Sequence, residues 1–247
     1  MIKDGLQEAK QEIDAFLLIG QSNMSGRGFL SEVPPIDNRQ CYMLRMGRWQ
    51  ILGEPVNQDR GPAAEFPCGC CLATSFADTY QKEIGRKVGV IPCADGGTTI
   101  SQWQPGEANF DHAVFQTKLA ARSAYIKGIL WHQGESDCKD TSLETYVERF
   151  KIMITEMRKQ LGDETLPVII GELSVDIPKN PRWKITPTQI ERMNANFRQI
   201  VREIPNCALA SSEGLTLNPD GIHFNSVSLR VFGKRYFKAY KENFAVK

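Results

Sequence analysis

Short apolar runs alternate with longer stretches of helical periodicity along this chain, and this alternation restricts the possible folds more than any other feature. The runs at 15–19, 88–94, 126–131, 167–171 and 207–210 are mostly apolar and are typical of buried strands. Between and after them, apolar residues recur at helical spacing, as at 143–161, 190–204 and 227–240. Strands and helices that alternate in this way form parallel sheets covered by helices on both faces. The sequence therefore predicts an α/β fold with three layers, α/β/α, around a five-stranded parallel sheet.

Length and charge place limits on the organisation and the partners of the chain. Its 247 residues suffice for a substantial core, and no repeat, low-complexity tract or linker divides them, so we predict a single domain over 1–247. Thirty basic and 29 acidic residues leave a net charge of +1, which excludes strong attraction to nucleic acid or to an anionic membrane. No apolar run approaches the ~20 residues that span a bilayer. A neutral substrate fits this balance best, and no feature indicates a particular oligomeric state.

The N-terminus and the cysteines indicate a cytoplasmic protein without a metal. Residues 1–14 are polar and charged and lack the hydrophobic segment of a signal peptide. Seven cysteines, an odd number, fit a reducing compartment better than a disulfide framework. The cluster Cys68-Gly69-Cys70-Cys71 lacks the second ligand pair that a structural zinc site needs. We therefore predict neither a metal site nor a cofactor.

A serine follows the first predicted strand directly. The run Ala15–Ile19 leads into Gly20-Gln21-Ser22-Asn23. Reactive groups in open α/β sheets lie just past the carboxyl ends of the strands, so Ser22 is a candidate nucleophile. Serine and asparagine also commonly cap the helix that follows a strand, and this position by itself does not distinguish the two roles.

The far end of the chain supplies the groups that a nucleophilic serine needs. Asp220 stands three residues before His223, one of only three histidines. A serine requires an imidazole to take its proton, and the imidazole requires an acceptor on its other nitrogen. An Asx-type turn that starts at Asn218 also explains the loop, and the two interpretations are compatible. We predict that Ser22, His223 and Asp220 act together.

Two further predicted strands end in residues suited to the same chemistry. The second run is followed by Gly96 and Gly97, and paired glycines allow backbone N–H groups to turn outward toward an oxyanion, although a simple tight turn is their commoner use. The third run is followed by an imidazole, an amide and two carboxylates at one strand end: His132, Gln133, Glu135 and Asp137.

These four segments, in this order, resemble the motif blocks of the SGNH (GDSL-like) hydrolases. Within these hydrolases, the segments most resemble the branch that contains acetyl xylan esterases and sialate O-acetylesterase-like proteins. The matching segments are Gly20-Gln21-Ser22-Asn23-Met24, Gly96-Gly97-Thr98 with Trp103, Trp131-His132-Gln133-Gly134-Glu135-Ser136-Asp137, and Asp220-Gly221-Ile222-His223. They run from residue 20 to residue 223, nearly the whole chain, and imply the flavodoxin-like fold of the SGNH hydrolases.

The resemblance also implies a role for each residue of the blocks. Ser22 is the expected nucleophile, His223 the general acid and base, and Asp220 the partner of His223. The expected oxyanion hole combines the Ser22 N–H, an N–H of Gly96 or Gly97, and the side-chain amide of Gln133. Asp220 is favoured over Glu135 and Asp137 as the acid because only three residues of chain separate it from His223.

Gln21 and Gln133 depart from the broader superfamily pattern, which has aspartate and asparagine at these positions. Both departures are typical of the carbohydrate-esterase branch, and a glutamine can replace an asparagine as a donor if the backbone lies further back. Gln21, Trp103 and Glu135 are the predicted contacts with substrate. Trp103 offers a face for a sugar ring, as does Trp183.

Two long loops are expected to shape the pocket. Residues 173–187 carry Trp183, and residues 25–65 carry a possible hairpin at 42–51 followed by an irregular stretch. Arg27 and Arg60, in the loop over residues 25–65, are candidate anion ligands, although a solvated role is the commoner one for arginine.

Together these features predict a serine esterase that removes O-acetyl groups from carbohydrate through an acyl-enzyme. The favoured partner is an acetylated carbohydrate, with acetylated xylan or xylo-oligosaccharide as the substrate class. A sialate O-acetylesterase and an esterase for another small acetylated metabolite are the alternatives within the same chemistry. A non-catalytic carbohydrate-binding module is the alternative outside it, and a serine, a histidine and an acid together argue against it because a binding module needs no base.

Overall fold

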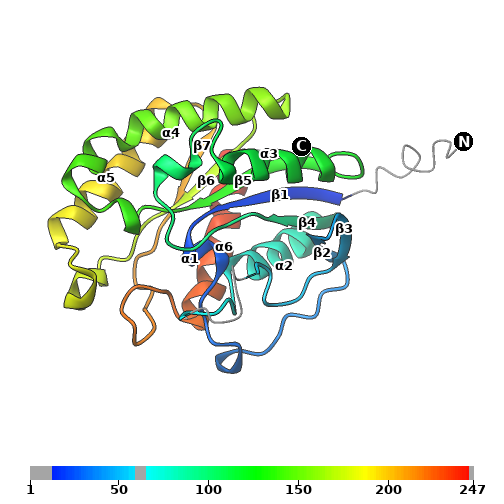
Figure 1. Ribbon diagram of the computed structural model, residues 1–247. Helices are drawn as coiled ribbons and strands as arrows, with labels where there is room; N and C mark the ends of the chain where they lie inside the picture. The colour runs from blue at the N-terminus through cyan, green and yellow to red at the C-terminus, as the bar shows by residue number, and fades with distance from the viewer. Residues whose placement is uncertain (1–12, 59–64, 245–247) are drawn as a thin grey trace, which may run out of the picture.

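A computed structural model describes residues 13–58 and 65–244. One mixed sheet runs through the centre of the molecule, with strand order β3-β2-β4-β1-β5-β6-β7 (Figure 1). The strands are β1 (Ile13–Gly20), β2 (Cys41–Arg45), β3 (Arg48–Ile51), β4 (Lys87–Pro92), β5 (Tyr125–His132), β6 (Val168–Gly171) and β7 (Cys207–Ala210). The helices are α1 (Ser22–Ser25), α2 (Leu72–Ile84), α3 (Ala108–Ala120), α4 (Asp140–Leu161), α5 (Pro187–Glu203) and α6 (Ser226–Asn243). Short 3-10 turns are η1 (Leu30–Glu32), η2 (Ile100–Trp103), η3 (Glu135–Asp137), η4 (Ile177–Lys179) and η5 (Pro181–Trp183).

The sheet has seven strands, so the predicted number of five was wrong. The five predicted strands are β1, β4, β5, β6 and β7, and they pair in parallel. The two additional strands form the hairpin expected at 42–51: β2 pairs in parallel with β4, and β3 pairs antiparallel with β2. The apolar pattern of this hairpin is weak because β3 lies at the sheet edge and exposes most of its residues, so it looked like part of a loop.

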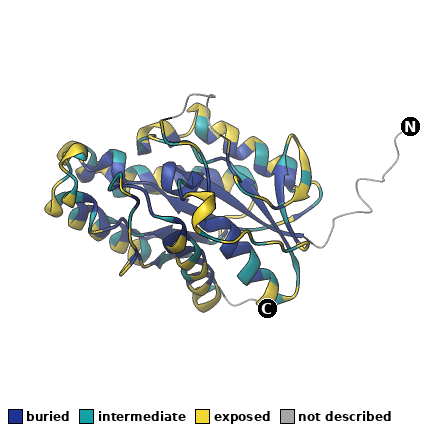
Figure 2. Cartoon of the chain, turned by 90° about the horizontal axis from the view of Figure 1, so that it is seen from below, coloured by how far each residue is buried: buried dark blue, intermediate teal, exposed yellow. Residues whose placement is uncertain are grey.

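Two hydrophobic cores lie on opposite faces of the sheet. Successive residues of β1 point to opposite sides, so Leu17 packs with α3, α4 and α5 in one core while Phe16 and Leu18 pack with α2 and α6 in the other. In Figure 1, α3 and α4 lie above β1, and α2 lies below it. Figure 2 shows the same division, with buried strands inside and exposed residues on the outer faces of the helices. The predicted three-layer arrangement is confirmed.

The carboxyl ends of the central strands meet at one edge of the sheet. Gln21 N donates to the carbonyl oxygen of His132 at 2.8 Å, which holds the end of β1 to the end of β5. Asp95 N donates to the carbonyl oxygen of Gly20 at 2.9 Å, which holds the loop after β4 to the same point. Three of the predicted motif segments therefore meet where β1 ends. No helix in the described residues is long and apolar enough to cross a membrane.

We predict that Gly233→Ala destabilises the fold through the contact between α2 and α6. A Cβ at Gly233 would overlap the carbonyl oxygen of Leu72 and the Ser75 hydroxyl, so the two helices would have to separate. Overpacking of this kind costs about 1–3 kcal/mol of unfolding free energy. Each kcal/mol lowers Tm by about 2–4 °C in a chain of this size. Thermal denaturation followed by circular dichroism measures the shift.

Gly53→Ala is the matched control, because among the described residues no atom beyond the glycine and its two chain neighbours lies within 4 Å of a Cβ built at Gly53. Its Tm should stay at the wild-type value. An equal Tm for Gly233→Ala and Gly53→Ala would show that α2 and α6 can separate without cost.

Candidate active site

The end of β1 presents Ser22 at the sheet edge. Gly20 has a φ of 125°, and a Cβ there would overlap the carbonyl oxygen of His132, so the close pairing with β5 requires glycine. Gln21 takes the N-cap position of α1, and Ser22 is the first residue of that helix. Ser22 is therefore not the helix cap, and its hydroxyl is directed elsewhere.

Ser22, His223 and Asp220 form a continuous chain of hydrogen bonds. Ser22 Oγ lies 2.9 Å from His223 Nε2, although 201 residues separate the two in sequence. His223 Nδ1 lies 2.9 Å from Asp220 Oδ2. Because a carboxylate only accepts, we assign the ring proton to Nδ1, which leaves Nε2 to accept from the serine hydroxyl. The structure thus brings the three predicted residues together in an arrangement that can transfer the serine proton.

The loop around Asp220 is both a turn and a support for the imidazole. Asp220 Oδ1 accepts from the N–H groups of Ile222 at 2.9 Å and His223 at 3.0 Å, which is the Asx-type turn. Burial alone would raise the pKa of the Asp220 carboxyl, but hydrogen bonds from the His223 ring and from these two N–H groups outweigh it and lower the pKa. Asp220 is therefore ionised at neutral pH and stabilises a positive charge on the ring.

Asn23 holds the His223 loop against the nucleophile. Its Nδ2 donates to the carbonyl oxygen of Ile222 at 3.1 Å, and its Oδ1 accepts from Phe224 N at 3.0 Å. The residues on both sides of His223 are thus bound by one side chain that adjoins Ser22. Glu135 Oε1 accepts from Asn23 Nδ2 at 2.6 Å and orients the amide.

Glu135 and Asp137 do not contact His223 in the described structure. Glu135 also lies 3.3 Å from His132 Nε2, and although its burial favours the neutral form, the adjacent imidazole and hydrogen bonds from His132 and Asn23 lower its pKa. Asp137 Oδ2 accepts from Gln133 Nε2 at 2.6 Å and from Ile100 N at 2.7 Å. The geometry favours Asp220 as the acid. Glu135 lines the pocket but is only 4% exposed, so its oxygens have little access to substrate.

The structure does not place Gln133 in the predicted oxyanion hole. Its side chain is fully buried, and its Nε2 donates to Asp137 Oδ2 at 2.6 Å, to the carbonyl oxygen of Thr98 at 3.0 Å and to Gln21 Oε1 at 3.3 Å. Tyr146 Oη donates to Gln133 Oε1 at 2.8 Å. All polar atoms of this amide are occupied inside the protein. A glutamine side chain is one methylene longer than an asparagine and reaches these partners. The partners come together only in the folded chain, so the sequence did not indicate them.

Trp103 does not line the pocket, which corrects the prediction that it contacts a sugar ring. It is fully buried, its ring packs edge-on against Trp131 at 5.6 Å, and its Nε1 donates to Thr98 Oγ1 at 3.0 Å. Trp103 therefore holds the loop after β4 from the protein interior, through its hydrogen bond to Thr98. Trp183 does line the pocket, and its Nε1 donates to the carbonyl oxygen of Asp220 at 2.7 Å.

Gly96 and Gly97 both line the pocket, but they differ in distance from the nucleophile. A Cβ built at Gly96 would lie 3.7 Å from Ser22 Cβ, whereas no described residue beyond the chain neighbours of Gly97 has an atom within 4 Å of a Cβ there. The backbone of Gly96 thus lies directly beside Ser22. This favours Gly96 as the backbone donor to an oxyanion.

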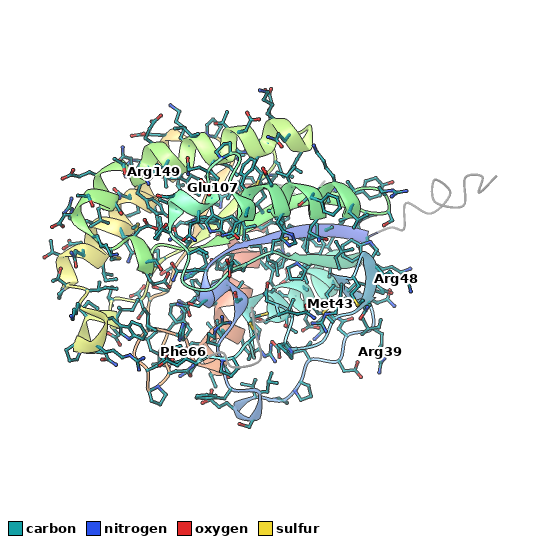
Figure 3. All side chains as sticks on the ribbon, viewed as in Figure 1. Arg39, Met43, Arg48, Phe66, Glu107 and Arg149 are labelled. Atoms are coloured by element: carbon teal, nitrogen blue, oxygen red, sulfur yellow. The ribbon has the colours of Figure 1, made fainter. Side chains whose placement is uncertain are left out.

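A pocket of about 1020 Å³ opens above Ser22 and His223. Phe66, which Figure 3 labels, forms part of its wall, with its ring 5.1 Å from the His223 ring and 6.2 Å from the Trp183 ring. Sequence reasoning missed Phe66, because a single aromatic residue in an irregular segment gives no periodic signal. Three basic and three acidic side chains line the pocket: Arg27, Lys139, Lys184, Glu65, Asp95 and Glu135. Arg60 lies outside the described residues.

Metal-ligating side chains do not cluster in the described part of the chain, and the one cysteine that lines the pocket there is buried. No group of three or more His, Cys, Asp or Glu residues there could hold a metal ion. All seven cysteines are free. Cys138 lines the pocket, but burial raises the pKa of its thiol, which keeps it protonated and weakly nucleophilic.

A family model described as "Carbohydrate esterase, sialic acid-specific acetylesterase" matches residues 12–242. The chain belongs to this family. It is therefore a carboxylic ester hydrolase, and the interpretation as a binding module is not retained.

Relatives and solved structures agree with the family. A probable carbohydrate esterase of Arabidopsis thaliana is 27% identical over 93% of this chain and 90% of its own length. The X-ray structure of an Arabidopsis thaliana protein superposes with a TM-score of 0.81 at 25% identity and covers 94% of this chain and 99% of that one. NanS superposes with a TM-score of 0.75 at 16% identity, covering 95% and 98% of the two chains. A lipase/acylhydrolase from Enterococcus faecalis superposes with a TM-score of 0.56 at 12% identity, covering 93% of this chain and 96% of that one. These solved structures confirm the predicted SGNH hydrolase fold.

We predict that Asp220→Asn is far more damaging to turnover than Glu135→Gln. With its carbonyl oxygen on the Ile222 and His223 N–H groups, an asparagine would present NH₂ to Nδ1 and force the ring proton onto Nε2, which could then no longer accept from Ser22. A tautomer error of this kind costs up to ~10⁴ in kcat in serine proteases. Glu135→Gln retains an oxygen for Asn23 and should cause a smaller loss.

Steady-state hydrolysis of an activated acetyl ester measures both effects, with circular dichroism to verify that each variant is folded. A larger loss of turnover in folded Glu135→Gln than in folded Asp220→Asn would assign the role of the acid to Glu135, in the loop after β5.

Proposed function

We propose that this protein is a serine esterase that removes O-acetyl groups from carbohydrate through a Ser22–His223–Asp220 triad. The observation that carries the proposal is the pair of 2.9 Å contacts from His223 to Ser22 Oγ and to Asp220 Oδ2. Imidazole and carboxylate in this relation are what a serine needs to become a nucleophile at neutral pH. Family membership supports acetyl-ester chemistry independently of this geometry.

The reaction divides into acylation and deacylation. Ser22 Oγ attacks the acetyl carbonyl carbon while its proton passes to His223 Nε2, and the carbonyl electron pair moves onto oxygen. The tetrahedral intermediate collapses, the sugar oxygen leaves with the proton from His223, and an acetyl-serine remains. The oxygen of a water molecule then attacks the acyl carbon while His223 takes one of the water protons. The second tetrahedral intermediate collapses, the proton passes from His223 to Ser22 Oγ, and acetic acid leaves and ionises to acetate in solution. Asp220 stabilises the cationic ring in both halves.

The pocket supports a carbohydrate alcohol as the leaving group. Phe66 and Trp183 supply aromatic surface beside His223, which is where the departing sugar oxygen must lie. The three basic and three acidic side chains that line the pocket give no strong preference for a charged substrate. An uncharged acetylated sugar, with acetylated xylan or xylo-oligosaccharide as the favoured class, fits both observations.

A sialate O-acetylesterase is the second candidate, and the position of Arg27 favours it. A Cβ at Gly96 would lie 2.9 Å from Arg27 Nη2, so the guanidinium adjoins the nucleophile. An acidic sugar could place its carboxylate there. The family description, which names a sialic acid-specific acetylesterase, also supports this candidate. The structure of a carbohydrate acetylesterase from Xanthomonas citri, 21% identical over 93% of this chain and 56% of that chain with a TM-score of 0.66, shares the fold and names no sugar.

We expect acetate release from acetylated xylo-oligosaccharide, and its loss in Ser22→Ala and in His223→Ala. Each substitution removes one member of the proton-transfer chain, and loss of such a member lowers kcat by a factor of about 10⁶ in a serine protease. A panel of acetylated xylo-oligosaccharide, O-acetylated sialic acid and an activated acetyl ester, each with enzymatic detection of acetate, measures the activity. Near-wild-type turnover by a folded Ser22→Ala variant would refute the proposed nucleophile.

The same panel separates the two sugars. A higher kcat/KM on O-acetylated sialic acid, reduced by Arg27→Gln, would replace the xylan assignment with the second candidate.

A further inference from the structure

Gln21 is held by its side-chain oxygen in one fixed orientation. Gln21 Oε1 lies 3.4 Å from Gly134 N, 3.3 Å from Ser136 N and 3.3 Å from Gln133 Nε2. All three partners are donors, so only the oxygen of the amide can face them. The NH₂ group of the same amide must therefore point away from the loop after β5.

The NH₂ group of Gln21 has no acceptor among the described residues. The described hydrogen bonds of the side chain all end on Oε1. Three described side-chain atoms are sealed from solvent without a partner, namely Glu135 Oε2, Asp137 Oδ1 and Asn218 Oδ1, and Gln21 Nε2 is not one of them. Since Gln21 lines the pocket beside Ser22, Nε2 retains access to that pocket. The residue is only 3% exposed, so this donor is nearly desolvated before substrate binds.

We propose that Gln21 Nε2 is the side-chain donor of the oxyanion hole. This inference rests on the proposed serine-esterase mechanism. When Ser22 Oγ attacks, the carbonyl oxygen gains a full negative charge, and a preoriented N–H strengthens its hydrogen bond as that charge develops. Gln21 precedes the nucleophile directly, and its own N–H is bound to the carbonyl oxygen of His132 at 2.8 Å, which fixes the backbone from which the amide extends.

The same arrangement assigns a different task to Gln133. Its Nε2 donates to Gln21 Oε1, so Gln133 helps to orient the donor and does not itself reach the oxyanion. The Ser22 N–H and a Gly96 N–H would complete the hole. Gln133 is thus a positioning residue, and Gln21 is the residue in contact with the reacting atoms.

Two substitutions of Gln21 test the proposal. Gln21→Glu retains an oxygen for the Gly134 and Ser136 N–H groups but removes the donor. Gln21→Met removes the donor without adding charge. Loss of one oxyanion donor lowers kcat by about 10²–10³, so we expect this loss in both variants, with KM for an activated acetyl ester little changed. Gln50→Glu and Gln50→Met, on the exposed edge strand β3, are the controls and should retain wild-type kcat.

A tetrahedral inhibitor provides the readout that a purely structural role would not change. A boronic acid forms a reversible tetrahedral adduct with the serine hydroxyl and places an oxygen in the hole. Its Kd should increase in both Gln21 variants by a factor similar to the decrease in kcat, while Tm by circular dichroism stays near that of the Gln50 controls.

The combination of results decides between the roles. A kcat within tenfold of wild type in Gln21→Met would overturn the proposal, because the neutral variant has no donor. A loss confined to Gln21→Met would assign Gln21 to holding the Gly134–Ser136 turn. A loss of kcat in both variants with an unchanged boronic acid Kd would also overturn it. If the wild-type protein fails to hydrolyse the ester, or Ser22→Ala retains activity, the proposed function fails instead.

Discussion

The contact between Ser22 and His223 is the interaction on which the site depends, and it joins residues 201 positions apart. The parallel sheet brings the end of β1 to the edge where the late loop returns, and the orange segment before α6 lies beside α1 in Figure 1. Asn23 then binds the backbone on both sides of His223. Because a hydrogen bond weakens steeply with displacement, this fixed backbone allows a 2.9 Å contact to persist.

The polar residues at the end of β5 and in the loop that follows it are buried beside the pocket. His132, Gln133, Glu135 and Asp137 are each less than 5% exposed, and each is hydrogen-bonded to another part of the site. A buried polar group without a partner costs about 1–3 kcal/mol, and two oxygens of this cluster, Glu135 Oε2 and Asp137 Oδ1, have no partner among the described residues. The side-chain nitrogen and oxygen of Gln133 both have partners inside the protein, which removes Gln133 from the available donors. Of the two glutamines Gln21 and Gln133, Gln21 is the one whose NH₂ group has no acceptor among the described residues.

Much of the fold could be predicted from sequence, because strands buried on both faces leave long apolar runs and their carboxyl ends must share one edge. The hairpin of β2 and β3 could not be placed in the sheet. Most of β3 is exposed, and Met46 and Gly47 make the turn with positive φ values in place of the usual Asn-Gly. Strand pairing across the chain is a tertiary choice, and nothing in the local pattern of residues 41–51 indicates β4 as the partner.

For the site, the sequence alone determined which residues could serve as nucleophile, base and acid: a serine past the first strand, and a histidine with an aspartate three residues before it. These follow from local spacing and from the limited set of groups that activate a hydroxyl. Tertiary structure decided the direction of each side chain. Trp103 turned into the core, Phe66 came beside His223, and the amide of Gln133 turned onto buried partners and away from the predicted oxyanion hole. The physical reason is that a flexible amide or a large ring takes its orientation from competing partners, here Tyr146, Asp137 and Trp131, which lie close to it only in the folded chain.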